Sequence, residues 1–267
     1  MYPFLHLGKI NIPLYGLMVL CGILLGLLIA VLRYRINGVA KDDVIYAFFY
    51  GLIGVFVGAK LLYILPRISQ IANSGYDFLQ ALYILFSSGF VFYGGLIGGL
   101  VMIIIYSRVY KIPTWPLFDS LLPSIPLIHA LGRVGCFFTG CCYGIPMDKP
   151  WGMLFNNSLV APHNIPLFPV QLLEAGLNGI VFIVLFLLGR KSRKPGWLLG
   201  LYLSIYAVER FFLEYLRYDF IERGMIGPFS TSQWISVIML PIGILLMILS
   251  EKYLQLPFFI KKNGQKS

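Results

Sequence analysis

The chain has 267 residues, of which 58% are hydrophobic and only 12% are charged, and its net charge is +10. A soluble domain carries about a quarter charged residues, so this much apolar surface cannot be covered by so few charges, and the excess must face lipid. The composition excludes a disordered chain, a nucleic-acid-binding module and a disulfide-stapled secreted domain, and it predicts an all-α integral membrane protein.

Seven apolar segments are long enough to cross a bilayer, which takes about 20 helical residues. In chain order they are 13–33, 45–65, 90–108, 117–136, 169–189, 196–216 and 231–250. The third is preceded by a further apolar stretch near 78–88, which is interrupted by Ser87 and Ser88. We expect that stretch to be an interfacial or re-entrant arm, with one long tilted helix as the alternative.

Basic residues orient these spans. Thirteen Lys and Arg residues fall in the segments after the first, third, fifth and seventh spans, and four fall on the opposite side. Because the basic side of a membrane protein is cytoplasmic, we expect the N-terminus outside, the C-terminus in the cytoplasm and the longest loop, 137–168, outside. Arg33 and Arg35 follow the first span, which argues against a cleaved signal peptide. Residues 1–267 are predicted to form one polytopic membrane domain.

Two glycine-rich stretches lie at span ends. The third span opens with Tyr93-Gly-Gly-Leu-Ile-Gly-Gly99, and glycines four residues apart let two helices pack closely. Tyr93 is either an aromatic-belt residue or a site residue. The stretch 132–144 ends the fourth span and contains Arg133, three cysteines and Gly144. Glycines permit turns whose N–H groups can bind an anion, and Arg133 adds a fixed charge.

Polar side chains at membrane depth mark the fifth and sixth spans. A charge at mid-bilayer costs about 2.5–3.5 kcal/mol on insertion scales, so several in one bundle indicate an internal polar cavity. Gln171 and Glu174 share one face of the fifth span, either for interhelical hydrogen bonds or for ligand contact. The sixth span places four residues on one helix face, namely Tyr206, Arg210, Glu214 and Arg217. They form either a buried ion network or a site for an anionic headgroup, because Arg binds phosphate through a planar fork.

The four cysteines differ in context. Cys21, inside the first span, is expected to be a packing residue. Cys136, Cys141 and Cys142 cluster on the outer side, either as structural thiols or a disulfide, or as site thiols. Their spacing is not the usual C-x2-C and no paired His accompanies them, so we expect no metal. His129, one turn before Arg133, is either a satisfied buried side chain or a base.

Five motifs follow one another along the chain: Pro13-Leu-Tyr15-Gly-Leu17, Tyr93-Gly-Gly-Leu-Ile-Gly98, Gly132-Arg-Val-Gly135 through Gly144, Pro169-Val-Gln-Leu-Leu-Glu-Ala175, and Tyr206-x3-Arg210-x3-Glu214-x2-Arg217. In this order they resemble the elements of the bacterial prolipoprotein diacylglyceryl transferase family, and Ser232-Gln233 resembles its last element. The resemblance covers nearly the whole chain.

The resemblance implies a reaction in the bacterial cytoplasmic membrane without a cofactor. A diacylglyceryl group moves from phosphatidylglycerol to the lipobox cysteine thiol of a preprolipoprotein, a thioether forms, and glycerol phosphate leaves. Arg133 and Arg210 would hold the phosphate and stabilise developing charge. Tyr15, Tyr93 and His129 are candidates for the base that deprotonates the acceptor thiol. The remaining expected substrate contacts are Glu214, Arg217, Tyr206, Gln171, Glu174, Cys136 and Gly144.

The central signature departs from the family pattern. Cys136 and Thr139 stand where the family has Asn, Cys141 stands where it has Glu, and Tyr93 stands at its His. The arginine framework is kept, whereas polar reaction residues are exchanged for thiols and a phenol. Two alternatives therefore remain beside the transferase: a diverged paralogue that lipidates another thiol or uses Cys141 as a nucleophile, and a non-enzymatic phospholipid-binding membrane protein.

Overall fold

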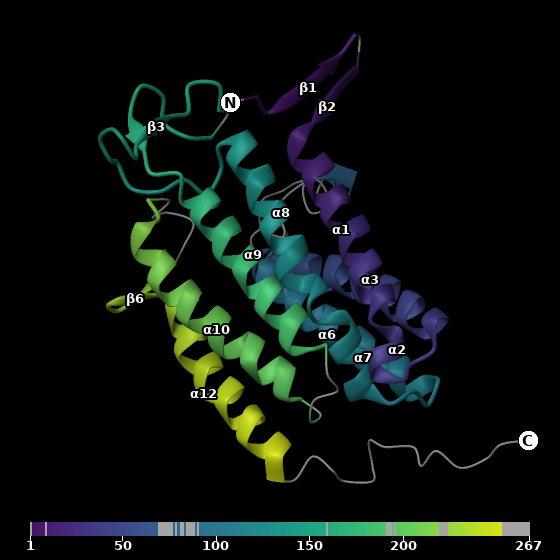
Figure 1. The fold of residues 1–267 in the computed structure, drawn as a ribbon. Helices are drawn as coiled ribbons and strands as arrows, with labels where there is room; N and C mark the ends of the chain where they lie inside the picture. Colours follow the sequence, from purple (N-terminus) through teal and green to yellow (C-terminus); the bar gives the residue numbers. More distant parts are fainter. Residues whose placement is uncertain are drawn as a thin grey trace, which may run out of the picture.

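Long helices form a bundle that carries small hairpins, two of them at one end (Figure 1). The computed structural model describes residues 2–8, 10–68, 77, 79–80, 83, 89, 91–158, 160–190, 194, 196–218 and 224–252. Its long helices are α1 (Leu14–Leu32), α3 (Lys41–Ile64), α6 (Phe92–Val109), α8 (Ser124–Thr139), α9 (Val170–Leu188), α10 (Trp197–Leu213) and α12 (Thr231–Lys252). The predicted arm near 78–88 lies mostly outside the described residues.

Shorter elements connect the long helices. The short helical pieces are α2 (Tyr34–Asn37), η1 (Leu65–Arg67), α7 (Thr114–Leu121) and η2 (Glu214–Leu216). Three antiparallel hairpins pair β1 (Phe4–Leu7) with β2 (Ile10–Pro13), β3 (Met153–Leu154) with β4 (Pro166–Leu167), and β5 (Met225–Ile226) with β6 (Phe229–Ser230). The hydropathy pattern did not predict these hairpins, because each is too short to give a periodic signal.

Every one of the seven apolar segments corresponds to helix. The described part of the chain has five helices long and apolar enough to cross a membrane: α1, α3, the combined stretch Thr114–Thr139, α9 and α12. α6 and α10 are apolar but shorter. Two predicted bounds were wrong. The fourth span is two helices, α7 and α8, which meet at Pro123, and the sixth ends at Leu213 because the chain tightens there into η2.

Glycines bring α3 and α6 into close contact. A Cβ built on Gly98 would meet the carbonyl oxygen of Gly54 and would lie 2.9 Å from the Cα of Gly58. Gly94 faces the Gly58 carbonyl in the same way. Small residues at such a crossing let backbones approach, so the predicted packing role of the Tyr93–Gly99 glycines is confirmed.

We predict that Gly98→Ala will lower the free energy of unfolding by about 1–3 kcal/mol, because the added methyl group overpacks the α3–α6 crossing. Gly176→Ala on α9 is the matched control, since a Cβ there meets nothing within 4 Å. Removing a helical glycine should leave that variant unchanged or stabilise it by about 0.5–1 kcal/mol. Thermal unfolding in detergent measures both, and equal effects would contradict the packing argument.

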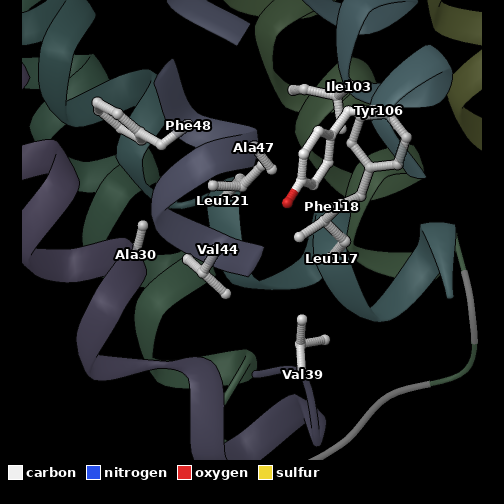
Figure 2. Packing of buried hydrophobic residues seen from close by; sticks show 10 residues of the cluster. All are labelled: Ala30, Val39, Val44, Ala47, Phe48, Ile103, Tyr106, Leu117, Phe118 and Leu121. Atoms are coloured by element: carbon white, nitrogen blue, oxygen red, sulfur yellow. The ribbon is translucent and has the colours of Figure 1, made fainter. Parts of the chain in front are cut away.

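A hydrophobic cluster holds four helices together at the end opposite β1 and β2. Figure 2 shows its side chains, which come from α1, α3, α6, α7 and the turn before α3. Leu117 and Val44 are fully buried within it. Each such side chain contributes about 1.5–3 kcal/mol when it is removed from water.

Arg33, at the end of α1 near this cluster, is buried although it was counted among the basic residues that set topology. Its guanidinium donates to the carbonyl oxygen of Asp119 at 3.2 and 3.3 Å, and to that of Gly189 at 2.8 Å. The side chain is 1% exposed. Arg33 thus ties the end of α1 to α7 and to the end of α9.

Candidate functional site

Glu174, a buried carboxylate on α9, lies at the centre of a polar cluster. α9 begins directly after Pro169, a residue suited to a helix start, and residues three and four apart share a helix face. Gln171, Glu174 and Asn178 therefore point the same way, and each is at most 1% exposed. Gln171 donates from Nε2 to the backbone carbonyl of Cys141 at 2.8 Å. Gln171 thus bonds to the turn after α8 and not to another helix, and its role as a ligand contact stays a prediction.

Arg133 on α8 is the first arginine of the cluster. Its Nε lies 3.0 Å from Oε1 of Glu174 and donates to Nε2 of His129 at 3.3 Å. His129 sits one turn earlier on α8, and its ring centroid is 5.7 Å from that of Tyr206. Because Arg133 engages the Nε2 lone pair, the geometry favours His129 as a positioning residue over His129 as a base.

Arg210 on α10 is the second arginine. Its Nη2 lies 2.9 Å from Oε2 of Glu214 and donates to the Ser232 hydroxyl at 3.2 Å. Arg210 and Glu214 therefore form a buried ion pair, as the ion-network alternative for this helix face expects. Nη1 of Arg210 is buried and has no hydrogen-bond partner among the described residues. One edge of this guanidinium is thus held by protein, and the other is available to an anion.

The two arginines face one shared cluster. Electrostatic interactions join Glu174 to Arg133, Arg210 and Arg217. Tyr206, buried on α10, interacts with Arg133 and Arg210 as well. Arg133 on α8 therefore pairs with Glu174 directly, and Arg210 on α10, which is paired with Glu214, interacts electrostatically with the same carboxylate.

Arg217 reaches this cluster by a route that the helical spacing did not predict. α10 ends at Leu213, and Arg217 has an extended backbone, so the four-residue helix face ends at Glu214. The segment around Arg217 instead pairs with the backbone around Gly144, where Ile145 N–H donates to the Leu216 carbonyl at 2.9 Å. This strand-like pairing, not helix periodicity, places Arg217.

Gly144 is required by this pairing. A Cβ on Gly144 would lie 2.5 Å from the carbonyl oxygen of Phe168 and 2.8 Å from that of Leu216. Only glycine lets three backbone segments cross so closely. The structure thus gives Gly144 a backbone role, and its contact with substrate stays a prediction.

Three cysteines gather where α8 ends. Gly140 closes the helix in a left-handed conformation with φ of +73°, and Cys142 also has a positive φ of +56°. These two turns fold the chain back, so the Sγ atoms of Cys136, Cys141 and Cys142 lie within 4.8 Å of one another. All three are free thiols. Hydrogen bonds from the thiols of Cys136 and Cys141 lower the pKa of Cys142, and the nearby guanidinium groups act in the same direction.

Tyr15 lies beside the cysteines. It is in the first turn of α1, and a Cβ on Gly135 of α8 would lie 3.1 Å from its ring. Tyr15 interacts electrostatically with Cys136 and Arg133, and it is 46% exposed. Tyr93 instead begins α6, whose main packing partner is α3. The roles of both tyrosines in the reaction stay predictions.

Two polar residues beside the cluster, Asn178 and Glu209, were not assigned to the site from the sequence. Asn178 donates from Nδ2 to the Glu174 carbonyl at 3.0 Å and to Oε1 of Glu209 at 2.7 Å. Glu209 in turn lines an apolar groove of about 670 Å³ between α9, α10 and α12, together with Leu173, Leu177, Val208 and Ile244. Asn178 follows Glu174 by four residues on a helix, a spacing that could have identified it.

Known proteins resemble this chain over most of its length. A family profile described as prolipoprotein diacylglyceryl transferase matches residues 3–249. A phosphatidylglycerol–prolipoprotein diacylglyceryl transferase of Clostridium tetani is 36% identical over 230 residues, which cover 86% of this chain and 90% of the relative. One of Cupriavidus metallidurans is 34% identical over 253 residues, 91% of each chain. A protein of Clostridium perfringens that carries the same name with the number 2 is 33% identical over 232 residues, 87% of this chain and 88% of the relative.

Proposed function

The chain belongs to the prolipoprotein diacylglyceryl transferase family, and we propose that its arginine cluster is the site where phosphatidylglycerol gives up its diacylglyceryl group. The protein is a membrane transferase that moves this group to a prolipoprotein. The acceptor atom is the thiol of the lipobox cysteine in the signal peptide, a thioether forms, and glycerol phosphate leaves. The observation that carries this proposal is the charged cluster in which Arg133 pairs with Glu174 while Arg210, paired with Glu214, interacts electrostatically with the same Glu174.

The arginines act on the leaving group. Displacement at the diacylglyceryl carbon that bears the phosphate leaves negative charge on the phosphate oxygens. The guanidinium groups stabilise that charge as it develops. Glu214 and Ser232 hold one edge of Arg210 in place, and Nη1 faces the phosphate. Glu174 and His129 fix Arg133 in the same way. Arg217, Tyr206 and Gln171 complete the lining.

The acyl chains of the donor occupy the apolar groove between α9, α10 and α12. Its lining is almost wholly aliphatic and aromatic, which suits a hydrocarbon chain. Glu209 lies on the groove wall and accepts a hydrogen bond from Asn178, which also donates to the backbone carbonyl of Glu174. The groove therefore adjoins the arginine cluster. A lipid can thus keep its tails in the apolar groove while its headgroup meets the guanidinium groups.

The protein crosses the bacterial cytoplasmic membrane seven times, with its N-terminus outside and its C-terminus in the cytoplasm. Thirteen basic residues on one side support this orientation. In Figure 1, β1, β2 and β3 lie at one end of the bundle, β3 being part of the loop that follows α8, and α2 and α7 lie at the other end. The site therefore opens on the outer side, where signal peptides of translocating proteins emerge, and residues 1–267 act as one domain.

Incubation of the purified protein with headgroup-labelled phosphatidylglycerol and a lipobox peptide tests the proposal. We expect lipidated peptide and released glycerol phosphate in equal amounts, because one bond is exchanged for another. The same peptide with Ser in place of its Cys should give neither product. Bound lipid without released glycerol phosphate would instead identify a phospholipid-binding protein, and label on the enzyme's own cysteines would identify a paralogue that uses Cys141.

A further inference from the structure

The three thiols at the end of α8 lie close enough together to hold one metal ion. Their Sγ atoms lie within 4.8 Å of one another, and among the residues that the structure describes they are the group of His, Cys and acidic side chains that meets this condition. Zn²⁺ binds thiolate sulfur at about 2.3 Å in tetrahedral geometry, which separates two sulfur ligands by about 3.8 Å. The sulfur–sulfur distances would have to shorten by at most about 1 Å to reach that spacing. The sequence spacing argued against a metal, but two left-handed residues fold the cysteines together.

Three ligands leave one coordination position open. Closed structural zinc sites have four protein ligands, whereas reactive sites have three and take water or substrate as the fourth. We propose that Cys136, Cys141 and Cys142 form a three-thiolate site for a thiophilic divalent cation such as Zn²⁺, and that its fourth position binds the acceptor thiol of the prolipoprotein. The inference rests on the proposed function, and it names how the acceptor is held and activated.

The surroundings fit an anionic metal–thiolate complex. Three thiolates and one divalent cation carry a net charge of −1, and binding of the acceptor thiolate makes it −2. Arg133 interacts electrostatically with Cys136 and Cys142, and Arg217 interacts with Cys142. Two guanidinium charges therefore offset the complex. Gln171 fixes the turn by its bond to the Cys141 carbonyl, which pre-organises the ligands.

The position also fits the chemistry. A thiol that coordinates such a cation loses its proton to solvent and becomes the nucleophile. Its sulfur attacks the carbon of the diacylglyceryl unit that bears the phosphate. The bond between that carbon and the phosphate oxygen breaks, and the oxygen keeps the electron pair. Arg133 borders both the thiols and Glu174, so the acceptor sulfur would lie next to the phosphate site. The resulting thioether is a weak ligand and leaves.

Titration of the reduced full-length protein in detergent with Co²⁺ tests the site, because four-coordinate cobalt thiolates have intense charge-transfer and visible bands. We expect one Co²⁺ per chain, and affinity lower by about 100-fold or more in Cys136→Ser and in Cys142→Ser. Cys21→Ser is the matched control, since Cys21 lies on α1 outside the group, and it should bind as the unaltered chain does. Size-exclusion profiles check that each variant is folded. Binding that is absent, or unaffected by both variants, would overturn the proposal.

A second measurement tests the open position. A lipobox peptide should change the cobalt bands, whereas the same peptide with Ser in place of Cys should not. Identical spectra with both peptides would refute thiol coordination. Lipid transfer at full rate after complete metal removal would also refute it and leave the proposed function intact. Cobalt bands that respond to the peptide, in a protein that transfers no lipid, would keep the metal site and reject the proposed function.

Discussion

Arg210→Ala is expected to slow transfer from phosphatidylglycerol to a lipobox peptide by about 100- to 1000-fold, or about 2.7–4 kcal/mol of transition-state stabilisation. Nη1 of Arg210 is buried without a hydrogen-bond partner among the described residues, so it is oriented for a ligand. The charge that it stabilises appears only as the phosphate leaves, so kcat should fall more than KM rises. Initial rates of glycerol phosphate release measure both constants.

Arg210→Lys separates charge from geometry. Lysine keeps the positive charge, but an ammonium group cannot bind Glu214 and a phosphate through a planar fork. We therefore expect Arg210→Lys to recover less than a tenth of the lost rate. Arg35→Ala serves as the control, because Arg35 is exposed beside Tyr34 at the opposite end of the bundle. Full activity in Arg210→Ala would rule out the arginine cluster as the phosphate site.

Glu174→Ala should lower the free energy of unfolding by about 3–5 kcal/mol, the cost of removing one partner of a buried ion pair. Glu174 is 1% exposed, and its carboxylate interacts with three guanidinium groups. Without it, the Arg133 guanidinium would lose its carboxylate partner and its charge would be left uncompensated. The midpoint of thermal unfolding in detergent, read by tryptophan fluorescence, gives the loss of stability.

A control variant and an addition of lipid show what that loss means. Asp148→Ala removes an exposed carboxylate from the loop after α8 and should change the midpoint little, because surface charges contribute about 0–1 kcal/mol. Addition of phosphatidylglycerol should restore part of the stability of Glu174→Ala, since an anionic headgroup can replace the missing negative charge. If Glu174→Ala and Asp148→Ala unfold at the same temperature, Glu174 does not hold the cluster together.

The helices could be predicted because lipid imposes a local rule. Backbone polar groups in a bilayer must be satisfied within one segment, so an apolar run of sufficient length becomes a helix whatever its neighbours are. All seven apolar segments are helical in the structure, although the fourth is divided between α7 and α8. The hairpins, the break between α7 and α8 and the early end of α10 did not follow from it, because turns and backbone pairing set those bounds.

Part of the site could also be predicted from contacts between residues close together in the sequence. Arg210 and Glu214 are four residues apart on one helix, and Arg133 and His129 are four apart on another, so helix geometry alone brings each pair together. Charges of this kind are rare at membrane depth, which made them recognisable as functional candidates. These spacings did not predict which helices face one another.

The sequence by itself determined the class of protein, the helical segments and the arginines that we propose bind an anionic lipid, because each depends on composition or on neighbours within one turn. Only the tertiary structure decided that Glu174 on α9 joins the arginines of α8 and α10, that Arg217 arrives through backbone pairing with Gly144, and that three cysteines meet as one group. These contacts join residues far apart in the chain, or residues separated by left-handed turns. Helix packing and backbone closure fix such contacts, and no periodicity encodes them.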